Sequence, residues 1–298
     1  MRLLISTCNH PKPVAANPEI SHFLWEYNTQ SFDLTPIPLH HPQLPQAYGV
    51  TGLARYRDGF VAMWQSPFPH LLYLSPNYRI QKVLPLTLTR DGHSLTVYDD
   101  TIWIASTGND SVTGVHHRHG EFLVWRANTR NRDTIHLNSL VFWEGELLVS
   151  AFGKRTGSLW KGSQAGYVIN ITRNRVVRNH LAHPHSLVTR PEGIYLCESA
   201  TKSVIGPSRK SLPIGRGYTR GLVITPSELC VGVSRQRKTS RSTGKVVEAD
   251  TKGEFKPGKC GLVFFNIDKQ EITACAFRGF MNLDPFAPEI YDVLLLEE

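Results

Sequence analysis

The sequence predicts an all-β fold, a six-bladed β-propeller. A short motif, a polar residue followed by Ser or Gly and then Leu, recurs five times along the 298 residues. A second apolar run begins nine residues after each polar residue. These runs are short, rich in β-branched and aromatic residues, and bounded by Gly, Pro, Asn or Asp, which is typical of strands. The motifs are 35 to 47 residues apart, and a period near 45 residues is typical of blades with four strands each.

The polar residues that open the motifs, here called the lead residues, are the best-defined positions of the repeat. They are Thr51, His93, Asn138, His185 and Arg220. The second apolar runs begin at Phe60, Ile102, Leu147, Ile194 and Leu229. A third run, Ser followed by an apolar residue, begins at Ser111, Ser158 and Ser203.

Both chain ends are expected to supply strands to one further blade. Residues 3–7 resemble the second strand of a blade whose first strand is missing, and residues 289–295 resemble a strand with no partner after it. Pairing them closes the ring and removes an exposed sheet edge. Seven blades are the main alternative. We expect one propeller domain over residues 1–298, with complete blades at 49–90, 91–135, 136–182, 183–217 and 218–280.

The last complete blade contains a basic insertion at residues 235–259. Its third strand, from Gly261, starts 41 residues after Arg220, whereas the other third strands start 18 to 20 residues after their lead residues. The insertion holds eight Lys or Arg residues against three Asp or Glu residues. Its composition is typical of a mobile loop. It is either a lid that attracts an anionic ligand or a solvated loop without a role.

Composition indicates a globular β protein, with 41% hydrophobic and 19% charged residues and a net charge of +8. No apolar stretch is long enough to span a bilayer, and the apolar start is too short for a secretory signal. The five cysteines are odd in number and lack CxxC spacing, which favours a reduced, cytoplasmic protein. Nucleic-acid binding is disfavoured because the basic insertion lacks interleaved aromatic residues.

The lead residues predict a site in the central channel. The first strand of each blade lines this channel, and loops from every blade converge at one end of it. The lead residues stand at the start of these strands, so we expect them to form a ring at one mouth together with Glu289. Just above the ring we expect Asp91, His136, His183 and Tyr218, and around it Ser106, Glu198 and Gln65. A purely structural, water-filled polar channel is the alternative.

The residue types of the ring suggest two chemistries. His93 and His185 could bind a divalent transition metal, with Glu289 or Asn138 completing the shell. They could instead act as acid and base near neutral pH. Arg220 would hold a carboxylate or phosphate. The other expected substrate contacts are Thr51, Tyr218 and Glu198. The histidines at 116, 117 and 119 fall in an outer hairpin, where a solvated edge is favoured over a metal site.

The pattern Gly92-His93-Ser94-Leu95, its later copies and the closing Glu289-Ile-Tyr-Asp-Val resemble the six-bladed propellers of the gluconolactonase and strictosidine-synthase type. The chain looks closest to an uncharacterised bacterial branch. The lactonase resemblance implies a channel calcium held by Glu, Asn and Asp side chains. Only Glu289 and Asn138 match that set, and His93, His185 and Arg220 depart from it. The paired histidines are similar in kind to streptogramin-lyase propellers, which use a divalent metal and a channel histidine to open a cyclic ester by elimination.

Together these observations predict an enzyme, a lyase or hydrolase that acts on a small anionic or cyclic substrate at the channel mouth. His93, His185, Asn138 and Arg220 would carry the chemistry. The alternative is a non-catalytic module that binds a ligand or a protein partner, because a fold does not by itself determine an activity.

Overall fold

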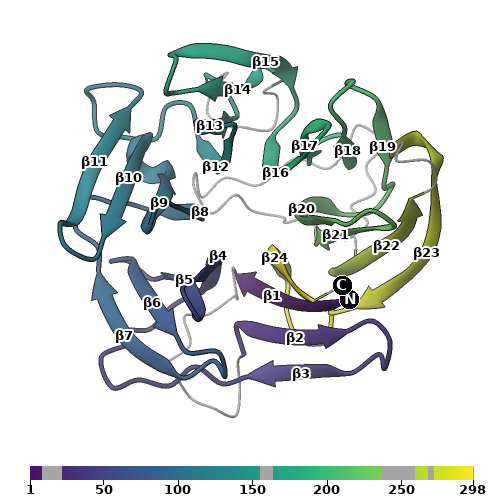
Figure 1. The fold of residues 1–298 in the computed structure, drawn as a ribbon, viewed down its shortest axis with the longest axis horizontal. Coiled ribbons are helices and arrows are strands. Elements are labelled where there is room, and N and C mark those ends of the chain that lie inside the picture. The colour runs from purple at the N-terminus through teal and green to yellow at the C-terminus, as the bar shows by residue number, and fades with distance from the viewer. Residues whose placement is uncertain (9–21, 155–163, 236–258, 268–271, 298) are drawn as a thin grey trace, which may run out of the picture.

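Six four-stranded antiparallel sheets are arranged as blades around a central channel (Figure 1). The structure is a computed structural model, and it describes residues 1–8, 22–154, 164–235, 259–267 and 272–297. The predicted six-bladed all-β fold is confirmed, and the seven-bladed alternative is wrong for the part of the chain that is described.

In every blade the strands are named here from the channel outward. Blade 1 contains β24 (Glu289–Glu297), β1 (Arg2–Cys8), β2 (Leu24–Asn28) and β3 (Leu34–Ile37), and blade 2 contains β4 (Gly49–Tyr56), β5 (Gly59–Gln65), β6 (His70–Leu74) and β7 (Ile80–Pro85). Blade 3 contains β8 (Gly92–Tyr98), β9 (Thr101–Ser106), β10 (Ser111–His116) and β11 (Gly120–Arg126), and blade 4 contains β12 (Leu137–Trp143), β13 (Glu146–Ala151), β14 (Gly166–Asn170) and β15 (Arg175–Leu181). Blade 5 contains β16 (Pro184–Arg190), β17 (Gly193–Glu198), β18 (Ser203–Ile205) and β19 (Ser211–Pro213), and blade 6 contains β20 (Tyr218–Ile224), β21 (Glu228–Ser234), β22 (Gly261–Ile267) and β23 (Cys275–Asn282).

Two short 3-10 helices are also present, η1 (Thr107–Asn109) and η2 (Ile272–Ala274). None of the described helices is long and apolar enough to cross a membrane. The five cysteines form no disulfide bond.

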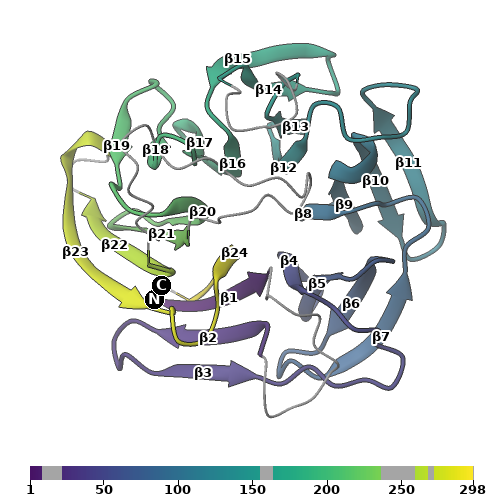
Figure 2. The same cartoon turned by 180° about the vertical axis from the view of Figure 1, so that it is seen from behind.

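The chain ends close the ring as predicted. β1 pairs antiparallel with β24, with Leu3 opposite Leu295 and Ile5 opposite Val293. The view from behind shows β1 and β24 side by side and the two termini next to each other (Figure 2). Blade 1 therefore contains strands from both ends of the sequence, and β24 covers the edge of β1 that faces the channel.

The repeat located most third strands correctly. β10 begins at Ser111, β18 at Ser203 and β22 at Gly261, as expected. The third strand of blade 4 is different, because β14 begins at Gly166 and not at Ser158, which lies outside the described residues. A two-residue signal of Ser plus an apolar residue is too short to separate a strand from a loop.

The predicted basic insertion falls between β21 and β22, and residues 236–258 of it lie outside the described residues.

The hydrophobic core lies between the blades. The buried apolar side chains of the described residues form six clusters, one at each contact between neighbouring blades. Successive residues of a strand point to opposite faces, so one strand contributes to two clusters. In β5, Phe60 and Trp64 pack toward blade 1, whereas Val61 and Met63 pack toward blade 3. Burial on both faces explains why the strands read as continuous apolar runs.

Candidate functional site

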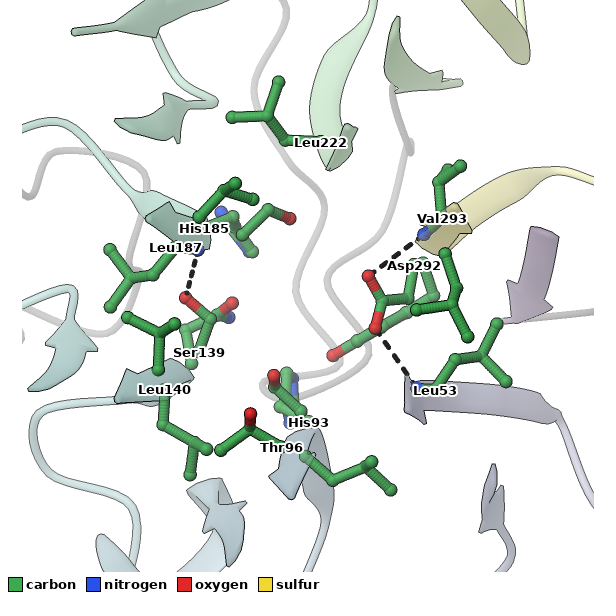
Figure 3. Close-up of a pocket in the computed structure, with 18 of the residues that line it drawn as sticks. Leu53, His93, Thr96, Ser139, Leu140, His185, Leu187, Leu222, Asp292 and Val293 are labelled. Carbon is green, nitrogen blue, oxygen red and sulfur yellow. Dashed lines mark hydrogen bonds between the residues drawn. The ribbon is translucent and has the colours of Figure 1, made fainter. Parts of the chain in front are cut away.

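A cavity of about 250 Å³ occupies the channel and is lined by the inner strands of all six blades (Figure 3). Four lead residues line one end of it: Thr51, His93, Asn138 and His185. The fifth, Arg220, is not among the lining residues, whereas Tyr291 of β24 is.

The channel has two ends, here called the leading face, where the inner strands begin, and the trailing face, where they end. The lead residues are buried, whereas lining residues farther along the inner strands, such as Thr96, Val141 and Leu295, are half-buried. We therefore infer that the cavity opens toward the trailing face. The lead residues form its closed inner end and not the open mouth that the sequence suggested.

The local backbone orients both channel histidines in the same way. The Nδ1 atoms of His93 and His185 lie 3.0 and 2.9 Å from the carbonyl oxygens of Asp91 and His183, respectively. A carbonyl only accepts, so Nδ1 carries the proton and Nε2 holds the lone pair. Asp91 and His183 have φ values of 50° and 56°, a left-handed conformation that Asp and His tolerate better than most residues.

Two polar groups at the inner end lack a partner. The Nε2 atom of His185 and the Nδ2 atom of Asn138 are buried and have no hydrogen-bond partner. Buried polar atoms are normally satisfied, so unpaired ones in a cavity wall mark a place where a ligand or water binds. The residues themselves are 1% and 3% exposed, respectively.

Aromatic and imidazole rings close the channel on its leading side. His93 contacts the rings of His136 and Tyr291 at centroid distances of 5.2 and 5.5 Å. Phe152 stacks on His183 at 4.3 Å, and its ring lies 5.1 Å from that of His185. This packing covers the two channel imidazoles on their leading side.

Burial controls the protonation of both channel histidines. It lowers the pKa of His93 to about 4, although the nearby Asp91 carboxylate acts in the opposite direction. Burial and then the positive charge of Arg220 lower the pKa of His185 well below its ordinary value. Both imidazoles are therefore neutral at pH 7, and they serve as hydrogen-bond acceptors at Nε2 and not as cations.

The His93→Gln variant is expected to resist acid better than the wild type. The folded pKa of His93, about 4, lies below the unfolded value of about 6.5. The contribution of His93 to the free energy of unfolding is therefore fully present above pH 6.5. It is lost as pH falls through 4, which lowers the free energy of unfolding by up to about 3 kcal/mol. Urea unfolding at pH 7.5, 5.5 and 4.5 should show that the free energy of unfolding of the variant, relative to that of the wild type, rises as pH falls. Exposed His180→Gln is the control, and parallel curves for His93→Gln and the wild type would contradict the assignment.

Arg220 and Glu289 face each other. The Nη1 atom of Arg220 lies 3.7 Å from Oε2 of Glu289, and both side chains are buried. This is within ion-pair range but beyond hydrogen-bond range, and Nε and Nη1 of Arg220 have no hydrogen-bond partner. The guanidinium also lies over the rings of Tyr291 and Tyr218, at 4.6 and 5.3 Å. Glu289 thus already balances the positive charge of Arg220, which was expected to bind a carboxylate or phosphate of the substrate.

The other predicted substrate contacts have local hydrogen bonds. Thr51 donates to the carbonyl of Gly92 at 2.6 Å. The Tyr218 hydroxyl lies 2.9 Å from Nδ1 of His183. Glu198 does not line the cavity.

Glu198, Ser106 and Gln65, which were expected around the ring, form hydrogen bonds with neighbouring residues. Glu198 accepts from the backbone N–H of Ala182 at 2.9 Å. Ser106 donates to Asn109 at 2.6 Å, and Gln65 donates to Asp91 at 3.2 Å.

Asp292 is the channel residue that sequence reasoning missed. It lines the cavity, and its carboxylate accepts from the backbone N–H of Leu53 at 3.1 Å and of Val293 at 3.0 Å (Figure 3). Burial raises its pKa to about 7, against the opposing effect of those two hydrogen bonds. A carboxyl group with such a pKa can both take up and release a proton at neutral pH.

A signal for Asp292 was present in the repeat. In blades 4 and 5 the residue after the lead residue is Ser, and its hydroxyl accepts an N–H from the next blade: Ser139 from Leu187 at 3.1 Å, and Ser186 from Gly221 at 2.8 Å. Asp292 makes the equivalent bond across the contact between blades 1 and 2. Asp292 stands out in the sequence because it is an acidic residue at a repeat position where the other copies have Ser or Gly.

The described channel residues do not bring three His, Cys, Asp or Glu ligand atoms together at one point. Among the described residues, the one group of three or more His, Cys, Asp or Glu side chains with ligand atoms within 4.8 Å of one another is Asp100, His116 and His117, on outer turns. The predicted set of His93, His185 and Glu289 is therefore not assembled. For calcium, which takes six to eight oxygen ligands, the Asp292 oxygens are already held by backbone N–H groups.

The fold is shared with solved structures of different activities. The nidogen–laminin complex contains a chain with a TM-score of 0.58 and 11% identity, covering 98% of this chain and 97% of that one. A 6-phosphogluconolactonase candidate from Bacteroides uniformis has a TM-score of 0.56 and 12% identity, covering 98% of both chains. The periplasmic gluconolactonase of Pseudomonas aeruginosa has a TM-score of 0.50 and 12% identity, again covering 98% of both.

At such identities the likeness shows the fold alone, and the predicted resemblance to gluconolactonase-type propellers is confirmed at that level. No curated protein matches this chain in sequence. A family model described as "Domain of unknown function (DUF4915)" matches residues 79–298, and the chain belongs to this family.

Proposed function

We propose that this propeller is an enzyme of the hydrolase or lyase type that opens a small cyclic ester in the channel cavity, with Asp292 transferring the proton. The observation that carries the proposal is the Asp292 carboxyl group, which lines the cavity and has a pKa of about 7, close to neutral pH. A group poised in this way, inside a cavity, is a common sign of a catalytic residue.

The cavity favours a compact, uncharged substrate. Its volume of about 250 Å³ is slightly below the usual range of roughly 300–1,000 Å³ for small-molecule sites. Its walls carry the apolar side chains of Leu95, Leu140 and Leu187, and its described lining contains no Lys or Arg. Of the two substrate classes that the sequence suggested, these features support the cyclic one over the anionic one.

Three groups of the cavity have complementary roles in ester opening. In hydrolysis, the Asp292 carboxylate takes a proton from the attacking water, and the oxygen of that water forms a bond to the carbonyl carbon. The ring C–O bond then breaks, and Asp292 returns the proton to the leaving oxygen. The unpartnered Asn138 amide can donate to the carbonyl oxygen as negative charge develops there. Nε2 of His185 can accept a hydrogen bond from the water.

In the lyase form, Asp292 takes a proton from carbon, and the ester C–O bond breaks to leave a double bond and a carboxylate. The same cavity groups serve both reactions. The gluconolactonase of Pseudomonas aeruginosa shares the fold, which supports the ester class at the level of analogy only.

Ring opening of a panel of five- and six-membered lactones tests the proposal. We expect turnover of uncharged lactones and little or none of their phosphorylated forms. For a general base with a pKa of about 7, kcat/KM should rise tenfold per pH unit below 7 and level off above it. Proton release at constant pH measures the reaction. A preference for the phosphorylated lactones, or no turnover across the panel, would reject the proposal.

A ligand-binding module without chemistry is the second candidate. The observation in its favour is that Asp292 makes the same contact between blades as Ser139 and Ser186, so its carboxylate could serve structure alone. In that case a ligand would bind unchanged, and replacing Asp292 by Ser would leave its affinity intact.

A further inference from the structure

Two neighbouring outer turns of blade 3 bring together a carboxylate and two imidazoles, from Asp100, His116 and His117. One ligand atom from each residue lies within 4.8 Å of the others, and His117 Nδ1 is 2.9 Å from Asp100 Oδ2. Two donors bound to one tetrahedral zinc at about 2.0–2.1 Å are roughly 3.4 Å apart. Small side-chain rotations are therefore enough to bring all three donors onto one ion.

The sheet register holds the two turns beside each other. Thr101 of β9 pairs directly with His116 of β10, so Asp100 and His117, the residues just beyond this pair, must also be neighbours. The first turn has left-handed residues at Asp99 and Asp100, with φ of 51° and 53°. The second is closed by the N–H of His119, which donates to the carbonyl of His116 at 3.2 Å. Such frames position ligands better than long loops do.

The donor set points to a transition metal. Two imidazoles and one carboxylate are typical of zinc sites that keep a fourth position open, and imidazole suits Zn²⁺, Cu²⁺ and Ni²⁺ better than Ca²⁺ or Mg²⁺. A third imidazole, that of His119, stacks on His116 at a centroid distance of 5.0 Å. We propose that Asp100, His116 and His117 form a zinc-type site at the outer edge of blade 3, separate from the channel cavity.

The guanidinium of Arg57 lies where the proposed metal ion would bind. Arg57 of the neighbouring blade lies with Nη2 3.0 Å from Oδ2 of Asp100, the same oxygen that faces His117. Its side chain is 53% exposed and can therefore leave when an ion binds. Because Arg57 and the metal compete for one carboxylate, removal of the arginine should strengthen metal binding.

Titration of the full-length chain, free of any histidine tag, with Co²⁺ tests the site, because the visible spectrum of Co²⁺ reports its ligands and geometry. We expect one equivalent to bind with a spectrum of mixed nitrogen and oxygen ligation, and Zn²⁺ to displace it. His116→Ala and His117→Ala should each weaken binding more than tenfold, a loss of at least about 1.4 kcal/mol. Arg57→Gln should tighten binding severalfold.

Two controls separate this site from other histidines. His180→Ala removes an exposed histidine of blade 4, and His93→Gln removes a channel histidine; both should leave Co²⁺ affinity unchanged. Thermal unfolding without metal should be the same for His117→Ala and the wild type, because His117 is exposed. The proposal is overturned if no stoichiometric binding occurs, if either control weakens binding as much as His117→Ala, or if Arg57→Gln weakens it. None of these results depends on lactone turnover.

Discussion

The stability of the Asp292→Asn variant relative to the wild type is expected to rise between pH 5 and pH 8, and the variant is expected to lose turnover. The folded pKa of Asp292, about 7, lies above its ordinary value of 3.8. Between these pH values the folded state keeps a proton that the unfolded state has released. Stability is thus fully present below pH 3.8 and is lost as pH rises through 7, at about 1.4 kcal/mol per unit. Asparagine stays neutral and escapes this loss.

Urea unfolding at pH 5 and pH 8 measures the effect. The advantage of Asp292→Asn over the wild type should grow by about 2–3 kcal/mol between the two pH values. Asp58→Asn, in an exposed turn, is the control and should follow the wild type at both. A difference that is independent of pH would mean that the Asp292 pKa is not raised.

The Asp292→Ser variant separates proton transfer from structure. Serine is the residue that blades 4 and 5 use at this position, and its hydroxyl can still accept the N–H of Leu53 as Ser139 accepts that of Leu187. We expect a well-folded protein whose kcat falls by about 10²–10⁴, the usual contribution of a general acid or base. Full activity in Asp292→Ser would remove Asp292 from the reaction and leave it a structural role.

The Glu289→Gln variant is expected to be strongly destabilised, by about 3–5 kcal/mol, because it leaves the buried guanidinium of Arg220 without a countercharge. Arg220 is 7% exposed and Glu289 is 3% exposed, so water cannot replace the lost carboxylate. Equilibrium urea unfolding at pH 7.5 measures the change.

A double-mutant cycle isolates the ion pair. Adding Arg220→Met to Glu289→Gln removes the uncompensated charge while keeping an unbranched apolar chain over Tyr291 and Tyr218. Most of the stability should return, because replacing both partners of a buried pair is often nearly neutral. If the two single changes add without coupling, the 3.7 Å contact is not an energetically significant ion pair.

The sequence by itself determined the architecture, because the repeat is a local property. Each blade needs an apolar run at fixed spacing, and the pairing of residues 3–7 with 289–295 follows from the need to close the ring. The lead residues of blades 2 to 5 could also be placed in the channel, because equivalent positions of a repeat occupy equivalent places. Thr51, His93, Asn138 and His185 accordingly line the cavity.

The tertiary structure alone decided which groups meet. The place of Asp292 in the repeat does not show that its carboxylate is buried against the backbone N–H groups of Leu53 and Val293, where burial raises its pKa. The ion pair of Arg220 with Glu289 joins two blades that only ring closure brings together. Asp100 meets His117 across two separate turns. The Arg220–Glu289 contact depends on the distance between strands far apart in the chain, and residue spacing within one repeat carries no information about that distance.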